Sequence, residues 1–255
     1  MSLRHRLWAS AITCAVLAPC ASAGHLQNEG FELSGGDSDS TTTFTGWNES
    51  GGGAYVRVAP TPLSGAASAH IVNNTAGGLL AQPVPYRVNK WSLDLDFTMP
   101  DPGGAGNRGL SLIIPDVTAG QINLRVVTGS QAGKGTVQVY SDQWNTIMTN
   151  AVNLSPSLDS PVVNHLRIDA DWSSPTTSQR TFVVTVGSTA TSPLSFYQGG
   201  TPSLIRQVEF HGEFSLGPYV VDNVSFIPEP AGIALLGLAS TALLARRRRN
   251  VTLRR

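Results

Sequence analysis

The sequence predicts an all-β protein: an antiparallel β-sandwich that lies between an N-terminal signal peptide and a short C-terminal transmembrane helix. Three observations support this fold class. Charged residues make up only 13% of the 255 residues, while 26 glycines and 16 prolines are present, and this composition favours strands and turns over helices. Apolar and polar residues alternate with a period of two in several segments, as they do in half-buried strands. The apolar runs that suit a helix stand at the two ends of the chain.

Residues 1–23 have the organisation of a secretory signal peptide. Two arginines form the basic start, residues 7–18 are apolar, and small residues occupy the cleavage position, Ala21 and Ala23. The apolar run is shorter than the ~20 residues that span a bilayer, which argues against a permanent anchor. We therefore expect the general secretion machinery to export the chain across the inner membrane, with the mature protein beginning at Gly24.

The mature domain, residues 24–227, is acidic although the whole chain has a formal net charge of zero. The two ends hold eight of the basic residues, so this domain keeps nine Lys and Arg against 16 Asp and Glu, a net charge near −7. That sign argues against nucleic acid and anionic membrane surfaces as partners. Both cysteines lie in the signal peptide, so the mature chain has no disulfide, thiolate metal site or cysteine nucleophile.

The last part of the chain, residues 228–255, combines three features in order. The motif Pro228-Glu229-Pro230 precedes residues 231–245, which carry no charge, and an arginine block follows: Arg246, Arg247, Arg248 and Arg249. At 1.5 Å per residue, a helix over the uncharged run reaches about 22 Å, which falls short of a ~30 Å bilayer core and makes a weak anchor. The arginines fix its end on the cytoplasmic side. A buried core helix is the alternative interpretation, and the adjoining arginine block argues against it.

This terminal arrangement resembles the PEP-CTERM sorting signal, which exosortases recognise. Pro228-Glu229-Pro230 matches the Pro-Glu-Pro motif of that family and the arginine block its basic stop, although six further residues follow here. The resemblance implies an exosortase as partner, a transient stay in the inner membrane and cleavage near Pro230. It also implies delivery to the cell surface or the extracellular matrix, and it leaves the final anchoring open.

The mature domain is expected to form one sandwich of short strands. In residues 91–97, large apolar side chains from Trp91 to Phe97 occupy one face and polar side chains the other. The same period predicts strands at residues 121–128, 136–140, 165–172, 181–186, 205–214 and 219–226, with turns rich in Gly, Pro and Ser between them. Residues 34–53 are expected to be mainly loop around Trp47.

Short motifs in this domain resemble jelly-roll carbohydrate-binding modules: residues 28–32, 46–47, 65–70, 80–82 and 221–226. Residues 91–187 equally resemble concanavalin-like lectin and laminin-G sandwiches. The resemblance implies a jelly-roll type antiparallel β-sandwich whose first and last strands lie together, and it leaves jelly-roll and concanavalin-like topologies as alternatives. It also implies extracellular polysaccharide as a partner, although a fold by itself assigns no ligand.

The same resemblance implies a structural calcium ion where the first strand meets the last. Glu29, Glu32 and Asp222 fall in the corresponding motifs, and carboxylate oxygens are the ligands that calcium prefers. Three carboxylates fill only part of a shell of six to eight ligands. The alternative is that Asp222 caps a turn or pairs with Arg206.

One predicted strand carries a candidate ligand face. Alternation places Glu209, His211 and Glu213 on one side of residues 208–214, where two carboxylates around an imidazole can bind a metal or act as acid and base. The preferred interpretation is a solvated strand face. A second polar row contains Asp169, and the two rows would form one sugar-binding surface if their strands were neighbours on the concave sheet.

The sequence gives little sign of catalysis. It contains no Gly-x-Ser-x-Gly elbow and no zinc-ligand spacing, and it lacks the Glu-x-Asp-x-x-Glu strand seen in concanavalin-like hydrolases. We therefore expect a non-catalytic protein that binds glycan or is structural, and that requires no cofactor. The alternative is an extracellular glycoside hydrolase or lyase, with carboxylates from distant strands that converge on the concave face.

Overall fold

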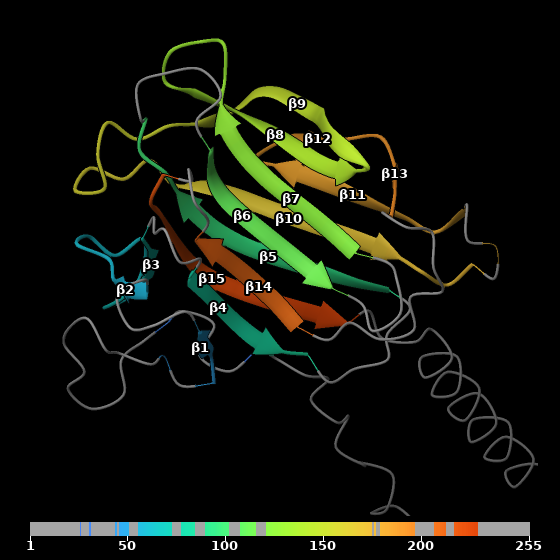
Figure 1. Ribbon diagram of the computed structural model, residues 1–255, viewed down its shortest axis with the longest axis horizontal. Helices are drawn as coiled ribbons and strands as arrows, with labels where there is room; N and C mark the ends of the chain where they lie inside the picture. Colours follow the sequence, from blue (N-terminus) through green and yellow to red (C-terminus); the bar gives the residue numbers. More distant parts are fainter. Residues whose placement is uncertain are drawn as a thin grey trace, which may run out of the picture.

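The computed structural model describes residues 26, 31, 44, 46–50, 56–72, 78–84, 90–101, 108–115, 121–174, 176, 179–196, 207–212 and 217–228. These residues form two antiparallel sheets that lie face to face, which confirms the predicted all-β sandwich (Figure 1). The predicted signal peptide and the predicted membrane segment, residues 231–245, lie outside the described residues. Within the described part, no helix is long and apolar enough to cross a membrane.

The first sheet has seven strands, and its last four members follow one another along the chain as simple hairpins. The order across the sheet is β1 (Asn48–Ser50), β4 (Gly78–Pro83), β14 (Gln207–Gly212), β6 (Arg108–Pro115), β7 (Gln121–Thr128), β8 (Lys134–Ser141) and β9 (Gln143–Asn153).

The second sheet has eight strands. The order is β12 (Thr189–Ala190), β11 (Thr181–Val186), β10 (Asn164–Asp171), β5 (Lys90–Thr98), β15 (Tyr219–Pro228), β3 (Ala69–Ile71) and β2 (Val56–Val58), with β13 (Leu194–Ser195) paired to β11.

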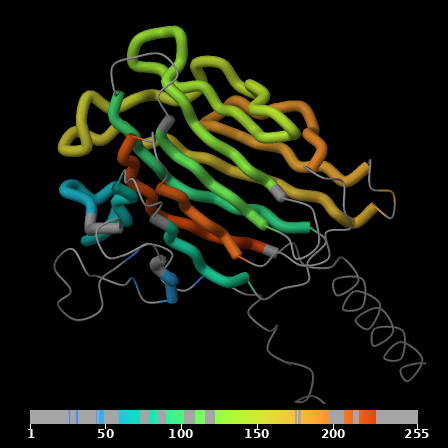
Figure 2. The backbone as a smooth tube through the Cα atoms, in the orientation of Figure 1, coloured from blue at the N-terminus to red at the C-terminus, as the bar shows by residue number. Residues whose placement is uncertain are grey.

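The chain moves between the two sheets repeatedly, so that segments far apart in sequence become neighbours. In Figure 2 the orange and red C-terminal strands lie beside the teal strands of the first half, because β14 pairs with β4 and β15 pairs with β5. Among the described strands, the last one, β15, lies between β5 and β3. Of the motif at residues 28–32, expected to form the first strand, Phe31 alone is described; it is buried, has a positive φ of 52° and belongs to no strand.

The core between the sheets follows the predicted alternation. Trp91, Leu93, Leu95 and Phe97 of β5 are buried, while Asp94 and Asp96 on the other side are partly exposed. Burying such side chains stabilises the fold by about 1.5–3 kcal/mol each. The seven-stranded sheet contributes the inward side chains of β6, β7 and β8: Leu110, Leu112, Ile114, Ile122, Leu124, Val126, Val137 and Val139.

Two details go beyond the sequence prediction. Within residues 34–53, expected to be mainly loop, Asn48–Ser50 form β1. Trp47, directly before it, is buried and contacts Phe31 and Phe210, with ring centroids 4.9 and 5.8 Å apart. Apart from residues 44 and 46–50, this range lies outside the described residues. Strand β9 is absent from the sequence prediction because its pattern is irregular. Its register with β8 shifts near Val137, and Asn150 has a positive φ of 54°. Such a bulge adds a residue to one strand and interrupts the period of two.

Candidate functional site

The residues predicted to form one ligand face lie on two different sheets. Glu209 and His211 belong to β14 of the seven-stranded sheet, whereas Asp169 belongs to β10 of the eight-stranded sheet. The two outward faces point away from each other, so the expected joint surface does not form. The period of two identifies the side of a strand that a residue occupies, but it carries no information about which sheet the strand joins. Glu213 lies outside the described residues.

Glu209 and His211 do share one face, as their spacing predicts. His211 Nε2 lies 2.7 Å from Glu209 Oε2, and Gln207 Nε2 donates to the other carboxylate oxygen. Both side chains are largely covered, with 12% of Glu209 and 21% of His211 exposed. Burial alone would raise the pKa of the Glu209 carboxyl, but the hydrogen bonds from His211 and Gln207 hold it below its usual value. Glu209 is therefore ionised near neutral pH and accepts these hydrogen bonds as a carboxylate.

A second group of polar side chains lies on this outward face, across β7, β8 and β9. The Arg125 guanidinium stacks on the Trp144 ring, with its central carbon 3.8 Å from the ring centroid. The Tyr140 ring meets Trp144 edge-on, with centroids 5.4 Å apart. Arg125 Nε donates a hydrogen bond of 2.8 Å to Gln138 Oε1. We call these four residues the aromatic–arginine cluster.

Strand register places this cluster and the Glu209–His211 pair on the same face. Glu209 is opposite Ile113, Ile113 is opposite Asn123, and Asn123 is two residues from Arg125 on β7. Opposed residues of neighbouring strands point the same way. From β14 to β9 the surface spans four strand intervals, about 19 Å at ~4.8 Å each.

The aromatic–arginine cluster has the composition of a sugar-binding surface. Tyr140 and Trp144 are partly exposed, so each ring presents apolar area beside amide and guanidinium groups. A sugar ring has an apolar C–H face and polar hydroxyls around its rim, and an aromatic platform with a few placed polar groups complements both. Neighbouring Thr146 extends the polar rim, because its hydroxyl accepts a hydrogen bond of 3.3 Å from Gln138 Nε2.

Sequence reasoning missed this cluster. Arg125, Gln138 and Tyr140 occupy outward positions of strands that were predicted, so their direction was visible in the alternation. Trp144 lies on β9, whose bulge hides the strand. Only the register between β7, β8 and β9 brings the arginine over the ring.

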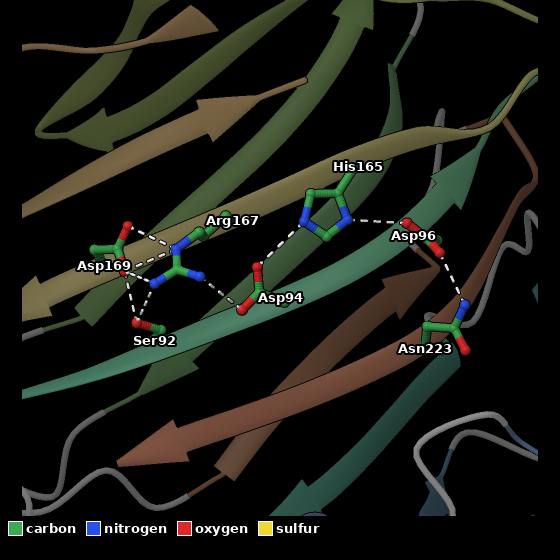
Figure 3. A network of polar contacts seen from close by, with 7 residues as sticks. All are labelled: Ser92, Asp94, Asp96, His165, Arg167, Asp169 and Asn223. Carbon is green, nitrogen blue, oxygen red and sulfur yellow. Dashed lines mark hydrogen bonds and ion pairs between the residues drawn. The ribbon is translucent and has the colours of Figure 1, made fainter. Parts of the chain in front are cut away.

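The outward face of the eight-stranded sheet carries a different arrangement, an ion-pair network of seven residues (Figure 3): Ser92, Asp94, Asp96, His165, Arg167, Asp169 and Asn223. His165 lies between two carboxylates, with Nδ1 3.0 Å from Asp96 Oδ1 and Nε2 3.2 Å from Asp94 Oδ1. Each contact places a ring nitrogen against a carboxylate oxygen, which only accepts hydrogen bonds. Asn223 Nδ2 donates a hydrogen bond of 2.8 Å to the remaining oxygen of Asp96.

The second half of the ion-pair network centres on Arg167. Its Nε donates to both oxygens of Asp169 at 2.9 Å, and one terminal nitrogen donates to Ser92 Oγ at 3.0 Å. Ser92 Oγ in turn donates a hydrogen bond of 2.6 Å to Asp169 Oδ1. The Arg167 hydrogen bond holds the pKa of Asp169 below its usual value against the opposing effect of burial, and Ser92 adds to the lowering. Asp169 is thus engaged by its own neighbours, which fits a role in joining strands β5 and β10.

Asp222 anchors a loop and has no exposed surface. Its Oδ2 accepts hydrogen bonds from the Ser68 hydroxyl at 2.6 Å and from the Ser64 amide at 2.9 Å, and its Oδ1 accepts the Asn223 amide at 2.8 Å. Burial raises the pKa of the Asp222 carboxyl in spite of these bonds. These contacts match the expectation that Asp222 caps a turn.

The calcium expectation depends on residues that are not all described. Glu29 and Glu32 lie outside the described residues, so their distance to Asp222 is not defined. Within the described ranges, no group of three or more His, Asp or Glu side chains has the geometry to hold a metal ion. Of the sorting motif, Pro228 ends β15 opposite Trp91. The remaining processing residues lie outside the described residues: Ala21, Ala23, Glu229, Pro230 and Arg246 to Arg249.

Comparisons with known proteins find solved structures of similar fold. No protein-family model matches the chain, and no curated protein matches it. The carbohydrate esterase vb_24B_21 from the Shiga toxin-encoding bacteriophage phi24B is similar over 72% of this chain and 91% of its own, with a TM-score of 0.55 and 10% identity. The carbohydrate recognition domain of Emp46p, in its potassium-bound form, is similar over 81% of this chain and 97% of its own, with a TM-score of 0.50 and 11% identity. At these identities the likeness concerns the fold, and function has to be argued from the site.

Proposed function

We propose that the chain is an exported glycan-binding protein, with a jelly-roll type sandwich that is delivered to the cell surface or the extracellular matrix. Its binding surface is the outward face of β7, β8 and β9. The observation that carries this proposal is the aromatic–arginine cluster, where a partly exposed Trp144 ring lies beside Tyr140, Arg125 and Gln138. Both structural neighbours named above are carbohydrate proteins by description, which supports the same class of ligand.

The ion-pair network on the opposite face is less suited to binding. Its carboxylates already accept hydrogen bonds from His165, Arg167 and Asn223. A ligand there would have to displace these contacts, and the lost bonds would offset the gain.

A panel of purified polysaccharides tests the glycan proposal by affinity electrophoresis with the full-length protein. We expect at least one polysaccharide to retard the wild type, and Trp144→Ala to weaken that binding by tenfold or more, since truncated aromatic anchors commonly cost over 1.4 kcal/mol. Arg167→Gln, on the opposite face, is the matched control and should bind as the wild type does. A wild type that is folded and binds none of the polysaccharides would leave only a structural role.

A second candidate function is a polysaccharide hydrolase or lyase. The observation that favours it is the Glu209–His211 pair, whose hydrogen bond of 2.7 Å orients an imidazole on the same face as Arg125. The ionised carboxylate would hold the imidazole ready to accept a proton. Activity on the same panel that disappears in both Glu209→Gln and His211→Ala would establish an enzyme, whereas binding without turnover keeps the non-catalytic assignment.

The sorting of the protein is also a proposal, and it rests on the two ends of the sequence. Export through the signal peptide and exosortase cleavage near Pro230 would give a mature protein of about residues 24–230. The prolines on either side of Glu229 disfavour helix there and leave the backbone accessible to a membrane peptidase. Intact-mass measurement on protein from the native host tests this, and recovery of a C-terminus at Arg255 from a host with an exosortase would contradict it.

A further inference from the structure

Charge is distributed unevenly between the two outward faces of the sandwich. Residues 121–153, which form β7, β8 and β9, contain three charged residues: Arg125, Lys134 and Asp142. Arg125 and Lys134 lie on strands, and Asp142 lies in the exposed turn between β8 and β9. The three strands themselves therefore carry two cations and no carboxylate.

The opposite face has the reverse balance. Strands β5 and β10 carry four aspartates, Asp94, Asp96, Asp169 and Asp171, against two permanent cations, Lys90 and Arg167. The whole mature domain carries a net charge near −7. The outward face of β7 to β9 is thus a cationic strip on an acidic protein, and it contains the aromatic–arginine cluster.

The two cations of this strip lie on the neighbouring strands β7 and β8. Arg125 is opposite Gln138, and Lys134 is four residues away on the same strand, about 13 Å at ~3.3 Å per residue. The Lys134 ammonium donates a hydrogen bond of 2.6 Å to Asn153 Oδ1 in an exposed position. Two positive charges therefore lie along the strip, and the one at Arg125 stacks on the Trp144 ring.

We propose that the glycan bound by this face is a polyanion, and specifically a polysaccharide of uronic acids. This inference rests on the proposed glycan-binding function and adds the class of sugar. A uronate has an apolar ring face that can stack on Trp144 and a planar carboxylate that matches the plane of a guanidinium. Carboxylates repeat along such a chain, so one residue can approach Arg125 while another approaches Lys134. The acidic opposite face repels the same polymer, which restricts binding to one side of the sandwich.

Matched polysaccharides distinguish recognition of negative charge from recognition of the uronate sugar itself. Polygalacturonate, its fully methyl-esterified form, dextran sulfate and neutral dextran are compared by affinity electrophoresis with the full-length protein, at low and at moderate salt. We expect polygalacturonate to bind at least tenfold more tightly than the methyl ester, with an affinity that falls as salt rises. Equal affinity for the free acid and the ester, or a preference for dextran sulfate, would overturn the assignment of uronate.

Variants on the strip locate the charge recognition. Arg125→Gln should weaken polygalacturonate binding about tenfold and flatten its salt dependence, while Lys134→Gln should weaken it two- to threefold because that ammonium is more exposed. Arg125→Lys keeps the charge and should restore part of the binding, which a merely structural role of Arg125 would not predict. Arg167→Gln is the control on the opposite face, and thermal unfolding of each variant verifies folding.

The outcomes for the two proposals differ. If neutral dextran binds as tightly as polygalacturonate and Arg125→Gln does not change binding, the uronate inference is overturned and the glycan-binding face is retained. A folded wild type that binds no polysaccharide at all contradicts the proposed function itself.

Discussion

The two outward faces of the sandwich arise from the same alternation but use their polar side chains differently. On the eight-stranded sheet, the ion-pair network links β10, β5 and β15 through contacts such as Arg167 to Asp169 and His165 to Asp96 (Figure 3). On the seven-stranded sheet, the aromatic–arginine cluster leaves two rings partly exposed. Polar groups that satisfy one another stabilise strand pairing, whereas an exposed ring beside a cation offers contacts that a ligand can complete. The comparison separates a structural face from a binding face.

The largest effect on stability is expected at Asp222, below the structural face. Asp222→Ala removes the acceptor of the buried Ser68 hydroxyl and of the part-buried backbone amides of Ser64 and Asn223, so all three donors lose this partner. We expect the free energy of unfolding to fall by about 2–3 kcal/mol. Ser68→Ala, which removes one donor and leaves the carboxylate, should cost about 1 kcal/mol. Chemical denaturation of the two variants checks this order of effects. Equal decreases in the free energy of unfolding would show that the Asp222 carboxylate is not the centre of this group of hydrogen bonds.

A smaller effect is expected at Arg167, in the centre of the structural face. Arg167→Gln leaves Asp169 and Asp94 without their guanidinium, but these side chains are partly exposed and solvent compensates. The free energy of unfolding should fall by no more than about 1 kcal/mol, and glycan binding should not change. Loss of binding with unchanged stability would reverse the roles assigned to the two faces.

The smallest and most specific effect concerns the pH dependence of the free energy of unfolding, to which two aspartates contribute with opposite signs. The folded pKa of Asp169 is lowered from 3.8, mainly by Arg167, so its stabilising contribution is present above 3.8 and is lost as pH falls through the folded pKa. The folded pKa of Asp222 is raised from 3.8 by burial, so its contribution is greatest at low pH and declines as pH rises through the folded pKa. The free energy of unfolding of each variant, Asp169→Asn and Asp222→Asn, is subtracted from that of the wild type at each pH. The two differences should change in opposite directions as pH rises. Parallel curves would contradict the contacts described for one of the two carboxyls.

The sequence predicted the sheets better than the sites. Strand β5 was predictable from its alternation, because side chains such as Trp91 and Phe97 are large and strictly spaced. Strand β9 was not, because a bulge near Asn150 interrupts the same signal. The grouping of Asp169 with Glu209 was wrong because sheet membership depends on long-range crossovers that no local pattern encodes. The pairing of Arg125 with Trp144 follows from register across three strands, which is also a long-range property.

The central claim is that glycan binds the face formed by β7, β8 and β9, and hydroxyl-radical footprinting tests it most directly. The full-length protein is oxidised with and without the polysaccharide that it binds most tightly, and modification is quantified residue by residue. The account predicts that the glycan protects Trp144 and Tyr140, while oxidation of His165 on the opposite face stays the same. Protection of His165 with no change at Trp144 and Tyr140 would contradict it.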